Sequence, residues 1–433
     1  MWQISKGRIN RLVVFKWVGN SYRPIGELNF EGGGRVRSGR FVYARSWLAS
    51  PDRVPVDPIG LPLRRGHVAG APNEIPLAFY DVGPDGWGKE VLAAAFPMLH
   101  LGMAEYLALG SLQRTGDLAF GPEPDVPVTW VPEDKPLLTL PREADALEDL
   151  LEAAEAVETG DPTEGHLHLL FRASADVGGA RPKARLRHDG AEWIAKFPAW
   201  GDPFDDPRVE AVCLDLADAA GIKVPERQLR VIGPKTVRLV RRFDRTAEGD
   251  RYGYLSAATL LKHSATAYHT SRTYVDIAVV ARTIGVAEPE PEIYRRLLVN
   301  SFLHNTDDHL RNMAFLSDGK GWRISPAFDL VPHRMGRHVC APASGVSPEH
   351  NPHSAAAAYA AFGLAIEEAR SIFDEVVTAM RGAPKILEAR EVSSKDRTTI
   401  TPLLQACFEP PAWAEYLIRG HSKKNTTSPD FGA

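Results

Sequence analysis

The residues best able to do chemistry lie in one short stretch, residues 301–316, with the sequence SFLHNTDDHLRNMAFL. Its centre combines carboxylates, imidazoles and amides, and apolar runs flank it on both sides. Asp307 and Asn312 are separated by four residues, the spacing of the Asp and Asn in a protein-kinase catalytic loop. There the Asp accepts the proton of the attacking hydroxyl and the Asn oxygen binds Mg²⁺. The spacing therefore favours phosphoryl transfer, with Asp307 as the base.

Two other interpretations of this stretch stay open. Four of its residues are of the types that bind a pair of hydrolytic metal ions: His304, Asp307, Asp308 and His309. A dinuclear metal-dependent hydrolase is therefore one alternative, and it would need a further ligand such as His263 or His269. The other alternative is structural, with Asp308 capping a helix and His309 a satisfied, partly buried histidine.

A phosphoryl-transfer site also needs a cation for the nucleotide phosphates and a second carboxylate for the metal. In AEWIAKFPA, Lys196 ends a predicted strand among apolar neighbours, where a charge needs a partner, and Glu210 on the next predicted helix can supply it. Asp329 follows a short strand in WRISPAFDLVP, where the second metal ligand is expected. Taken alone, Lys196 is more simply a lysine that reaches solvent from a strand end. The order of these residues along the chain favours the kinase, because a hydrolase has no use for Lys196.

The segment DVGGARPK, upstream of Lys196, places Gly178, Gly179 and Lys183 between two β-like stretches. Adjacent glycines let backbone N–H groups approach a phosphate, and a nearby lysine can neutralise it. Two glycines between strands are more often a hairpin turn, so this motif is weak evidence by itself.

The surrounding sequence predicts the elements that position these residues. Short strands are expected in the first 50 residues, a loop over 51–75, and a helix beginning near Trp87. After a proline-rich segment, 120–141, we expect a helix ending before Gly160, two strands around a turn at Asp189-Gly190, a helix closing at Gly221, and the strand TVRLVRRFDR. From about residue 254 the pattern is mostly helical. The predicted domains are 1–145, 146–250 and 251–420, followed by a polar tail, 421–433.

Composition limits the function classes. The 433 residues carry 51 basic and 55 acidic side chains, a net charge of −4, which argues against direct nucleic-acid binding. The three cysteines are widely spaced, so a zinc site or a disulfide framework is not expected. No apolar run approaches the roughly 20 residues that span a bilayer. We expect a soluble, cytoplasmic protein without a membrane partner.

Seven segments, in order, resemble the HipA-like serine/threonine kinases of bacterial toxin–antitoxin modules: YDVGPDGWGKEVL, GDLAFGPEP, GGARPKA, IAKFP, VRRFDR, NTDDHLRNMAFL and ISPAFDLVP. The resemblance covers nearly the whole chain. It implies an α+β, protein-kinase-like two-lobed fold with a small β-rich N-terminal subdomain and a mostly helical C-terminal lobe. It also implies ATP and Mg²⁺ as cofactors.

The resemblance assigns roles residue by residue. Asp307 would be the catalytic base, and Asn312 and Asp329 would hold Mg²⁺. The expected nucleotide-binding residues are those of the phosphate-side loop, the ATP lysine, the adenine edge and the catalytic and metal loops: Gly178, Gly179, Ala180, Arg181, Pro182, Lys183; Lys196; Arg241, Arg242, Phe243; His309, Leu310, Arg311, Asn312; Phe328 and Asp329.

One departure from the family concerns the loop before GGARPK. Family members typically carry an autophosphorylated serine there, and this chain has Asp176 at that position, with Ser174 two residues earlier. We expect that the protein either modifies Ser174 instead or lacks this self-inactivation; a merely solvated Asp176 is the simpler possibility.

The resemblance further implies a growth-arresting toxin linked to persistence, whose partner is a small helix-turn-helix antitoxin. DNA contact would come only through that complex. The substrate would be a cellular protein, an aminoacyl-tRNA synthetase being one example in the family. A kinase-like small-molecule phosphotransferase stays a second possibility. Residues 333–356 are expected to form a mobile loop that faces the substrate.

Overall fold

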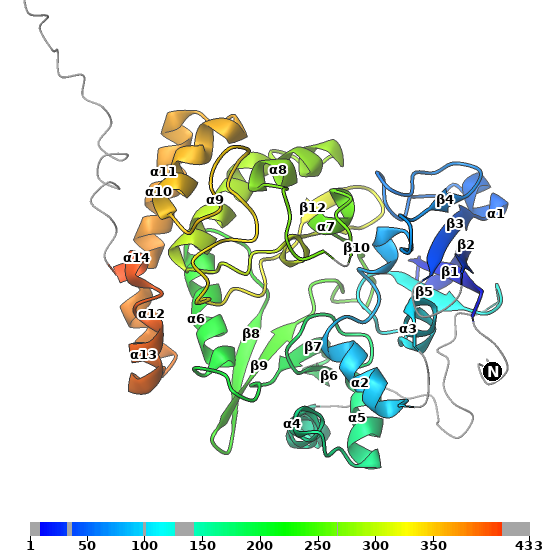
Figure 1. Ribbon diagram of the computed structural model, residues 1–433, viewed down its shortest axis with the longest axis horizontal. Coiled ribbons are helices and arrows are strands. Elements are labelled where there is room, and N and C mark those ends of the chain that lie inside the picture. Colours follow the sequence, from blue (N-terminus) through cyan, green and yellow to red (C-terminus); the bar gives the residue numbers. More distant parts are fainter. Residues whose placement is uncertain (1–8, 33–36, 98–100, 126–142, 266, 409–433) are drawn as a thin grey trace, which may run out of the picture.

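The structure is a computed structural model that describes residues 9–32, 37–97, 101–125, 143–265 and 267–408. The predicted polar tail, and most of the proline-rich segment 120–141, lie outside these ranges. Three antiparallel sheets and a set of helices make up the described part (Figure 1).

The N-terminal sheet has five strands in the order β4-β3-β2-β1-β5. The strands are β1 (Arg11–Val18), β2 (Ser21–Glu31), β3 (Ser38–Tyr43), β4 (Val68–Ala69) and β5 (Leu118–Gly121). The elements that accompany it are α1 (Arg45–Ala49), the 3₁₀ turn η2 (Leu77–Phe79) and α3 (Met103–Leu109). Helix α2 (Trp87–Ala95) lies instead beside α5 (Glu164–Ser174), near the second sheet (Figure 1). The predicted early strands and the helix start at Trp87 are confirmed, whereas the predicted loop over 51–75 is interrupted by β4.

The second sheet has four strands in the order β6-β7-β9-β8: β6 (Lys183–His188), β7 (Ala191–Lys196), β8 (Arg227–Ile232) and β9 (Lys235–Arg241). Asp189 and Gly190 both have positive φ, as a two-residue hairpin turn requires. Helices α4 (Glu143–Thr159), α5 (Glu164–Ser174) and α6 (Asp206–Ala219) accompany this sheet. The sequence did not predict α5 or β8, and a helix rather than a strand therefore precedes Gly178 and Gly179.

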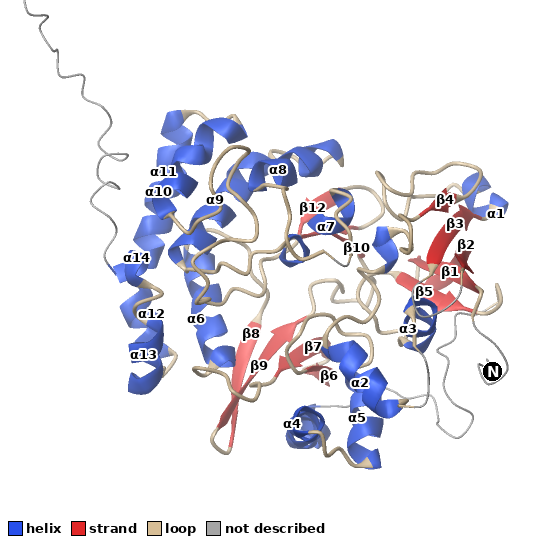
Figure 2. Ribbon diagram, viewed as in Figure 1, coloured by secondary structure: helices blue, strands red, loops and turns tan. Residues whose placement is uncertain are grey.

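The C-terminal part is helical, as Figure 2 shows, but it also holds a small sheet, of which the sequence predicted only the short strand ahead of Asp329. Its strands are β10 (Gly253–Ser256), β11 (Ala314–Ser317) and β12 (Trp322–Ile324). The helices are α7 (Ala257–Leu260), α8 (Tyr274–Thr283), α9 (Pro289–Phe302), η3 (Leu310–Asn312), α10 (Pro352–Ala357), η4 (Ala358–Phe362), α11 (Ile366–Met380), α12 (Ala383–Ala389), α13 (Ser394–Ile400) and α14 (Gln405–Phe408). The apolar run MAFL that follows Asn312 is thus largely strand β11.

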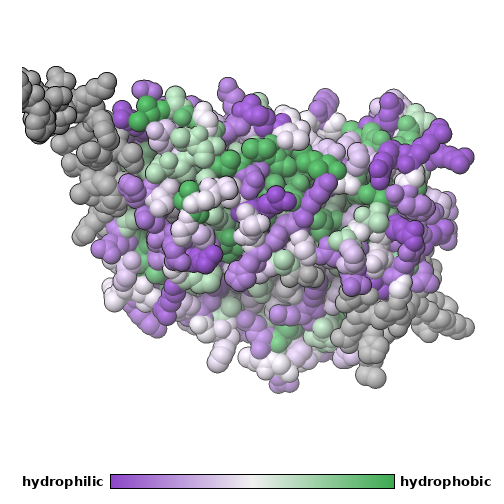
Figure 3. All heavy atoms as spheres, turned by 45° about the horizontal axis from the view of Figure 1, so that its top comes forward, coloured by the Kyte–Doolittle hydropathy of each residue, from purple (hydrophilic) through white to green (hydrophobic). Residues whose placement is uncertain are grey.

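The predicted fold class, a β-rich N-terminal region followed by a largely helical C-terminal part, is confirmed. One large core runs from Leu12 and Phe41 in the first sheet to Phe302 and Val376 in the helical part, and a second packs α4 and α5 on the four-stranded sheet. On the face drawn in Figure 3, apolar side chains gather in a patch surrounded by polar ones. Among the described residues, no helix combines the length and hydrophobicity that crossing a membrane requires. The domain limits stay a prediction.

Candidate active site

Lys196, at the end of β7, lies between two carboxylates. Its Nζ donates hydrogen bonds to both oxygens of Glu210 on α6, at 2.8 and 3.0 Å, and to Asp329 Oδ1 at 2.5 Å. Burial by itself would raise the pKa of Asp329, but Lys196 and Lys183 outweigh it and hold that pKa below its ordinary value. The predicted partnership of Lys196 with Glu210 is confirmed, and Asp329 joins it as an anion.

Arg238 is a member of this site that the sequence analysis missed. It lies opposite Lys196 in the β7–β9 ladder, is 1% exposed, and forms an ion pair with Glu210. Glu210 is itself 1% exposed, so its charge is balanced by two cations inside the protein. The available signal was a charged residue in the middle of the apolar strand TVRLVRR, the same signal that drew attention to Lys196.

The phosphate-side loop, residues 178–183, brings Lys183 close enough to Asp329 for their charges to interact. Lys183 is 7% exposed; burial lowers its pKa to about 8, against the opposing effect of Asp329. Gly179 has φ +86°, and a Cβ added to it would lie 2.5 Å from Lys183 Nζ. The positive φ favours glycine at this position, whereas the end of the flexible Lys183 side chain could move aside for a Cβ. Arg181 is held by Asp202 at 2.6 Å and Asp206 at 2.9 Å.

Asp176 is buried rather than solvated, and the simpler expectation for it is wrong. It is 2% exposed, forms an ion pair with Arg185, and accepts hydrogen bonds from the Ser111 amide at 2.9 Å and the Ser111 hydroxyl at 2.8 Å. Ser174 is fully buried, and its hydroxyl donates to the Lys183 carbonyl at 2.7 Å. The side chains of Asp176 and Ser174 are therefore both engaged in contacts inside the protein.

Helix α2 of the N-terminal region contacts the same loop through its first residues. The Trp87 amide donates to the Gly179 carbonyl at 2.9 Å. A Cβ at Gly86 would lie 2.6 Å from that carbonyl oxygen, and a Cβ at Gly88 would lie 2.6 Å from the Val177 carbonyl oxygen. The glycines of GPDGWG thus allow backbone to pack on backbone where the two segments meet.

The catalytic loop that follows α9 holds Asp307 half-buried, with its side chain turned toward a different segment. Asp307 Oδ1 accepts a hydrogen bond of 2.6 Å from the Tyr268 hydroxyl, and its Oδ2 lies 3.9 Å from His333 Nε2. The Asn312 side-chain amide donates to the Asp307 carbonyl at 3.0 Å, which fixes the two residues relative to one another. Residues 329–333 join the Lys196 group to this loop, because Asp329 bonds to Lys196 and His333 approaches Asp307.

Asp308 does not cap a helix, and that expectation is wrong. It is 6% exposed and accepts from the amides of Val339 at 2.8 Å and Cys340 at 3.3 Å and from the Tyr274 hydroxyl at 2.7 Å. The two amides donate to Oδ1, whereas His338 Nδ1 lies 2.9 Å from Oδ2, the oxygen that also accepts from Tyr274. Asp308 therefore anchors the beginning of the segment 333–356 to the catalytic loop.

His304 has φ +53° and stacks on His350, with ring centroids 3.9 Å apart. His350 Nδ1 lies 3.2 Å from His338 Nε2. Burial, which is the largest effect, lowers the pKa of His350 to about 3. Burial also lowers the pKa of His304, so His304 and His350 pack as neutral rings, in keeping with the structural role expected of His304.

The other three predicted loop residues, 309–311, differ in their contacts. His309 Nδ1 is buried without a hydrogen-bond partner among the described residues, Leu310 is a core residue, and Arg311 donates to the Ala265 carbonyl at 3.3 Å. His309 Nδ1 is therefore available for one further hydrogen bond.

The three residues of the predicted adenine edge differ in whether they are free to contact a base. Phe243 stacks on Phe328 with centroids 5.5 Å apart, which places an aromatic pair next to Asp329. Arg241 is paired with Glu226 at 3.0 Å. All five N–H groups of Arg242 are taken, by Asp244, Glu192 and the carbonyls of residues 113 and 114. The Arg242 side chain therefore joins the sheet to the N-terminal region and has no donor left for a base.

The donor types at Asn312 and Asp329, an amide oxygen and a carboxylate, suit Mg²⁺, which prefers oxygen ligands and shares them with phosphates. Among the described residues, no three His, Cys, Asp or Glu side chains gather as a metal site. The dinuclear hydrolase alternative therefore lacks the ligand cluster it needs there.

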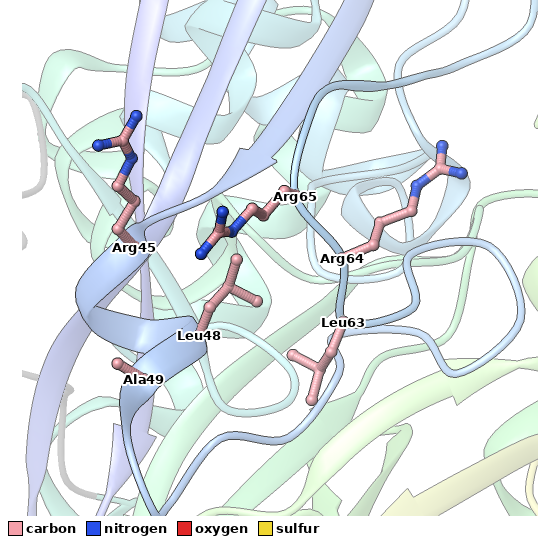
Figure 4. A pocket seen from close by; sticks show the side chains of 6 residues that line it. All are labelled: Arg45, Leu48, Ala49, Leu63, Arg64 and Arg65. Carbon is pink, nitrogen blue, oxygen red and sulfur yellow. The ribbon is translucent and has the colours of Figure 1, made fainter.

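A hollow of about 310 Å³ lies elsewhere, on the N-terminal region (Figure 4). Its lining is Arg45, Leu48, Ala49, Leu63, Arg64 and Arg65. It contains none of the residues expected in the active site, so the chemistry described above does not take place in it.

Comparison with known proteins places these observations in a family. A family model for the HipA N-terminal domain matches residues 17–122, and one for the HipA-like C-terminal domain matches residues 175–383. The structure is similar to the HipA chain of a Shewanella oneidensis MR-1 complex of HipA, HipB and operator DNA, with 18% identity, a TM-score of 0.66, and coverage of 94% of this chain and 99% of that one.

A second solved structure, the proinflammatory kinase CtkA of Helicobacter pylori, has 15% identity and a TM-score of 0.37, over 52% of this chain and 89% of that one. At this TM-score the likeness adds nothing to the argument. The two family models together span most of the chain, and the first solved structure shares its fold over 94% of the chain. The chain belongs to the HipA family.

Proposed function

We propose that this protein is an ATP- and Mg²⁺-dependent serine/threonine protein kinase that acts as the toxin of a toxin–antitoxin system. The observation that carries the proposal is the position of Lys196 between Glu210 and Asp329. A helix carboxylate that holds a strand lysine, next to a metal-binding aspartate, is the arrangement that phosphoryl transfer from ATP requires.

On this proposal, Lys196 and Lys183 face the nucleotide phosphates. Glu210 fixes the lysine in place, and Arg238 offsets the remaining charge of Glu210. When the phosphates bind, Lys196 has anionic oxygens to replace its contact with Asp329, which frees that carboxylate for the metal. The unpartnered His309 nitrogen supports a ligand on this side of the loop.

Asn312 and Asp329 would hold the Mg²⁺, which supplies charge neutralisation to the phosphoryl group. Asp307 orients the acceptor hydroxyl and takes its proton, and the Asn312–Asp307 hydrogen bond keeps base and metal ligand in register. Phe243 and Phe328 offer an apolar surface to the base.

The partner is proposed to be a HipB-like helix-turn-helix antitoxin in the cytoplasm, because the HipA of the Shewanella complex assembles with HipB and operator DNA. DNA contact would come through that complex. The segment 333–356, anchored by Asp308, is proposed to face the protein substrate, with an aminoacyl-tRNA synthetase as one candidate.

The test is phosphoproteomics after brief expression of the wild type and of Asp307→Gln, with Asp161→Asn, an exposed aspartate beyond α4, as the control. We expect new phosphoserine or phosphothreonine sites with the wild type and Asp161→Asn, and none with Asp307→Gln. Purified Asp307→Gln should still bind Mg-ATP, whereas Lys196→Ala should not. Undiminished transfer by Asp307→Gln would contradict the assignment, and label recovered only in small molecules would favour the alternative phosphotransferase.

A further inference from the structure

Tyr268 places a hydroxyl directly on the proposed catalytic base. Its Oη donates to Asp307 Oδ1 at 2.6 Å, and its ring meets the His309 ring edge-on, with centroids 6.2 Å apart. The partial burial of the phenol, together with the carboxylate that accepts from it, raises the pKa of Tyr268. The phenol is therefore a protonated donor, as an acceptor hydroxyl is before transfer.

A base can act on a hydroxyl that lies within about 2.6–3.2 Å of it, because the proton then moves along an existing hydrogen bond. Tyr268 meets this requirement in the resting structure. No other described hydrogen bond is made to either carboxylate oxygen of Asp307; the next neighbour is His333, at 3.9 Å from Oδ2. The phenol thus takes the place that an incoming serine or threonine hydroxyl would need.

The segment that carries Tyr268 is attached to neighbouring parts of the site on both sides of the tyrosine. The Ala265 carbonyl accepts from Arg311 of the catalytic loop at 3.3 Å, and the Tyr274 amide donates to the Ala341 carbonyl at 3.0 Å. Tyr268 itself is 41% exposed. Its side chain can therefore leave Asp307 without unfolding the segment, and it returns to the same place because the ends are fixed.

We propose that Tyr268 is an internal phosphate acceptor, a modification site that the protein phosphorylates on itself. This inference rests on the proposed kinase function. Proximity within one chain selects the phenol, so it requires no tyrosine specificity toward other proteins.

The step balances with ATP as the only co-reactant. The Tyr268 oxygen forms a bond to the γ-phosphorus, the bond between that phosphorus and the β–γ bridging oxygen breaks, and its electron pair leaves with ADP. The phenolic proton goes to Asp307.

The product would not stay where the phenol was. A phosphotyrosine carries a charge of about −1.5 to −2 at neutral pH and would stand beside the carboxylates of Asp307 and Asp308. Like-charge repulsion then drives the side chain out toward solvent, which opens the base to an external hydroxyl. Unphosphorylated Tyr268 would thereby block Asp307, and a single phosphorylation of Tyr268 would make Asp307 accessible to external substrates.

The experiment incubates the full-length protein with Mg-ATP and maps phosphate by mass spectrometry of peptides, with an Escherichia coli lysate added in a parallel reaction. The variants are Tyr268→Phe, which keeps the ring and removes the hydroxyl, Asp307→Gln, and Tyr359→Phe as a matched control on a half-buried tyrosine of η4. We expect phosphate on Tyr268 in the wild type and in Tyr359→Phe, with a first-order rate that does not depend on protein concentration. Asp307→Gln should show none.

Tyr268→Phe should lose that phosphopeptide and still label lysate proteins, because the acceptor has gone and the base remains. Labelled lysate proteins without phosphate on Tyr268 would overturn this inference and leave the kinase function standing. Loss of all labelling in Tyr268→Phe would also overturn it, since the phenol would then be a positioning group. Absence of transfer to any acceptor by the wild type would overturn the kinase function and this inference together.

Discussion

Replacing Gly88 by alanine tests whether α2 of the N-terminal region positions the phosphate-side loop. Gly88 is the second residue of α2, and an added Cβ would lie 2.6 Å from the Val177 carbonyl oxygen and 3.2 Å from that of Ser174. Real Cβ contacts stay beyond 3.0 Å, so the Val177 carbonyl must move by at least about 0.4 Å. The loop that carries Gly178 and Gly179 begins at the next residue.

Two effects on stability oppose each other in this variant. Alanine is favoured over glycine inside a helix by up to about 1 kcal/mol. Forcing an extra methyl into a packed contact costs about 1–3 kcal/mol. Gly165 is the matched control, because it is the second residue of α5 and its added Cβ would meet only the Thr163 hydroxyl oxygen, at 3.7 Å. Gly88→Ala should therefore be less stable than Gly165→Ala by about 1–3 kcal/mol.

The functional effect follows from the displacement of the loop. A shift of about 1 Å at a positioned group can cost about a hundredfold in rate, so a shift of some tenths of an ångström should slow phosphoryl transfer from Mg-ATP by roughly three- to tenfold. Urea unfolding measures the stability of both variants, and initial rates of phosphoryl transfer from Mg-ATP measure the functional effect. Equal stability of Gly88→Ala and Gly165→Ala, together with a wild-type transfer rate, would refute the reasoning.

Three further predictions concern the same loop. Mg-ATP binding should weaken by up to about tenfold per pH unit above pH 8, because burial lowers the pKa of Lys183 to about 8 and the neutral amine no longer attracts phosphate; calorimetry at increasing pH measures this. Asp176→Ala should destabilise the protein by roughly 3–5 kcal/mol in urea unfolding, because it leaves Arg185 buried without its carboxylate. Ser174 should carry no phosphate after incubation with Mg-ATP, as read by phosphopeptide mass spectrometry, because its buried hydroxyl is bonded to the Lys183 carbonyl.

Each of these has a control. The folded pKa of Lys183 lies below the ordinary lysine value, so between these two values the unfolded chain binds more protons and the lysine's contribution to stability rises with pH. Unfolding at this group therefore cannot imitate the loss of binding, and Lys183→Met should bind weakly with no such pH dependence. A wild-type Mg-ATP affinity that does not change with pH would contradict the prediction.

Asp161→Ala, at an exposed position, is the control for Asp176→Ala, and equal stability of the two variants would contradict the stabilising role of the buried Asp176–Arg185 pair. Phosphate on Ser174 would show that the loop leaves its buried position.

Much of the candidate site is predictable from the sequence because its signals are local. The spacing of Asp307 and Asn312, and a lysine among apolar strand residues ahead of a helix glutamate, need no knowledge of distant contacts. The structure brings Lys196, Glu210 and Asp329 together as that reasoning requires.

The parts that the sequence did not predict depend on distant pairing. Of the three strands in the small sheet only β12 was expected; β10 and β11 have four residues each, too short for a periodic pattern, and β10 meets β11 some 60 residues later in the chain. The role of Asp308 is set by amides about 30 residues downstream, and the contact of Tyr268 with Asp307 joins two loops. No local pattern around Asp308 or Tyr268 marks those contacts.

The contacts of Arg242 limit how the end of β9 and the N-terminal region can move relative to one another. Its guanidinium and Asp244 tie the end of β9 to residues 113–116 of the N-terminal region, with Asp244 accepting from the Gly116 amide at 2.8 Å. Pulling these groups apart would strand buried charges at a cost of about 3–5 kcal/mol. An opening that admits a nucleotide should therefore leave this contact intact, so that the end of β9 and residues 113–116 move together.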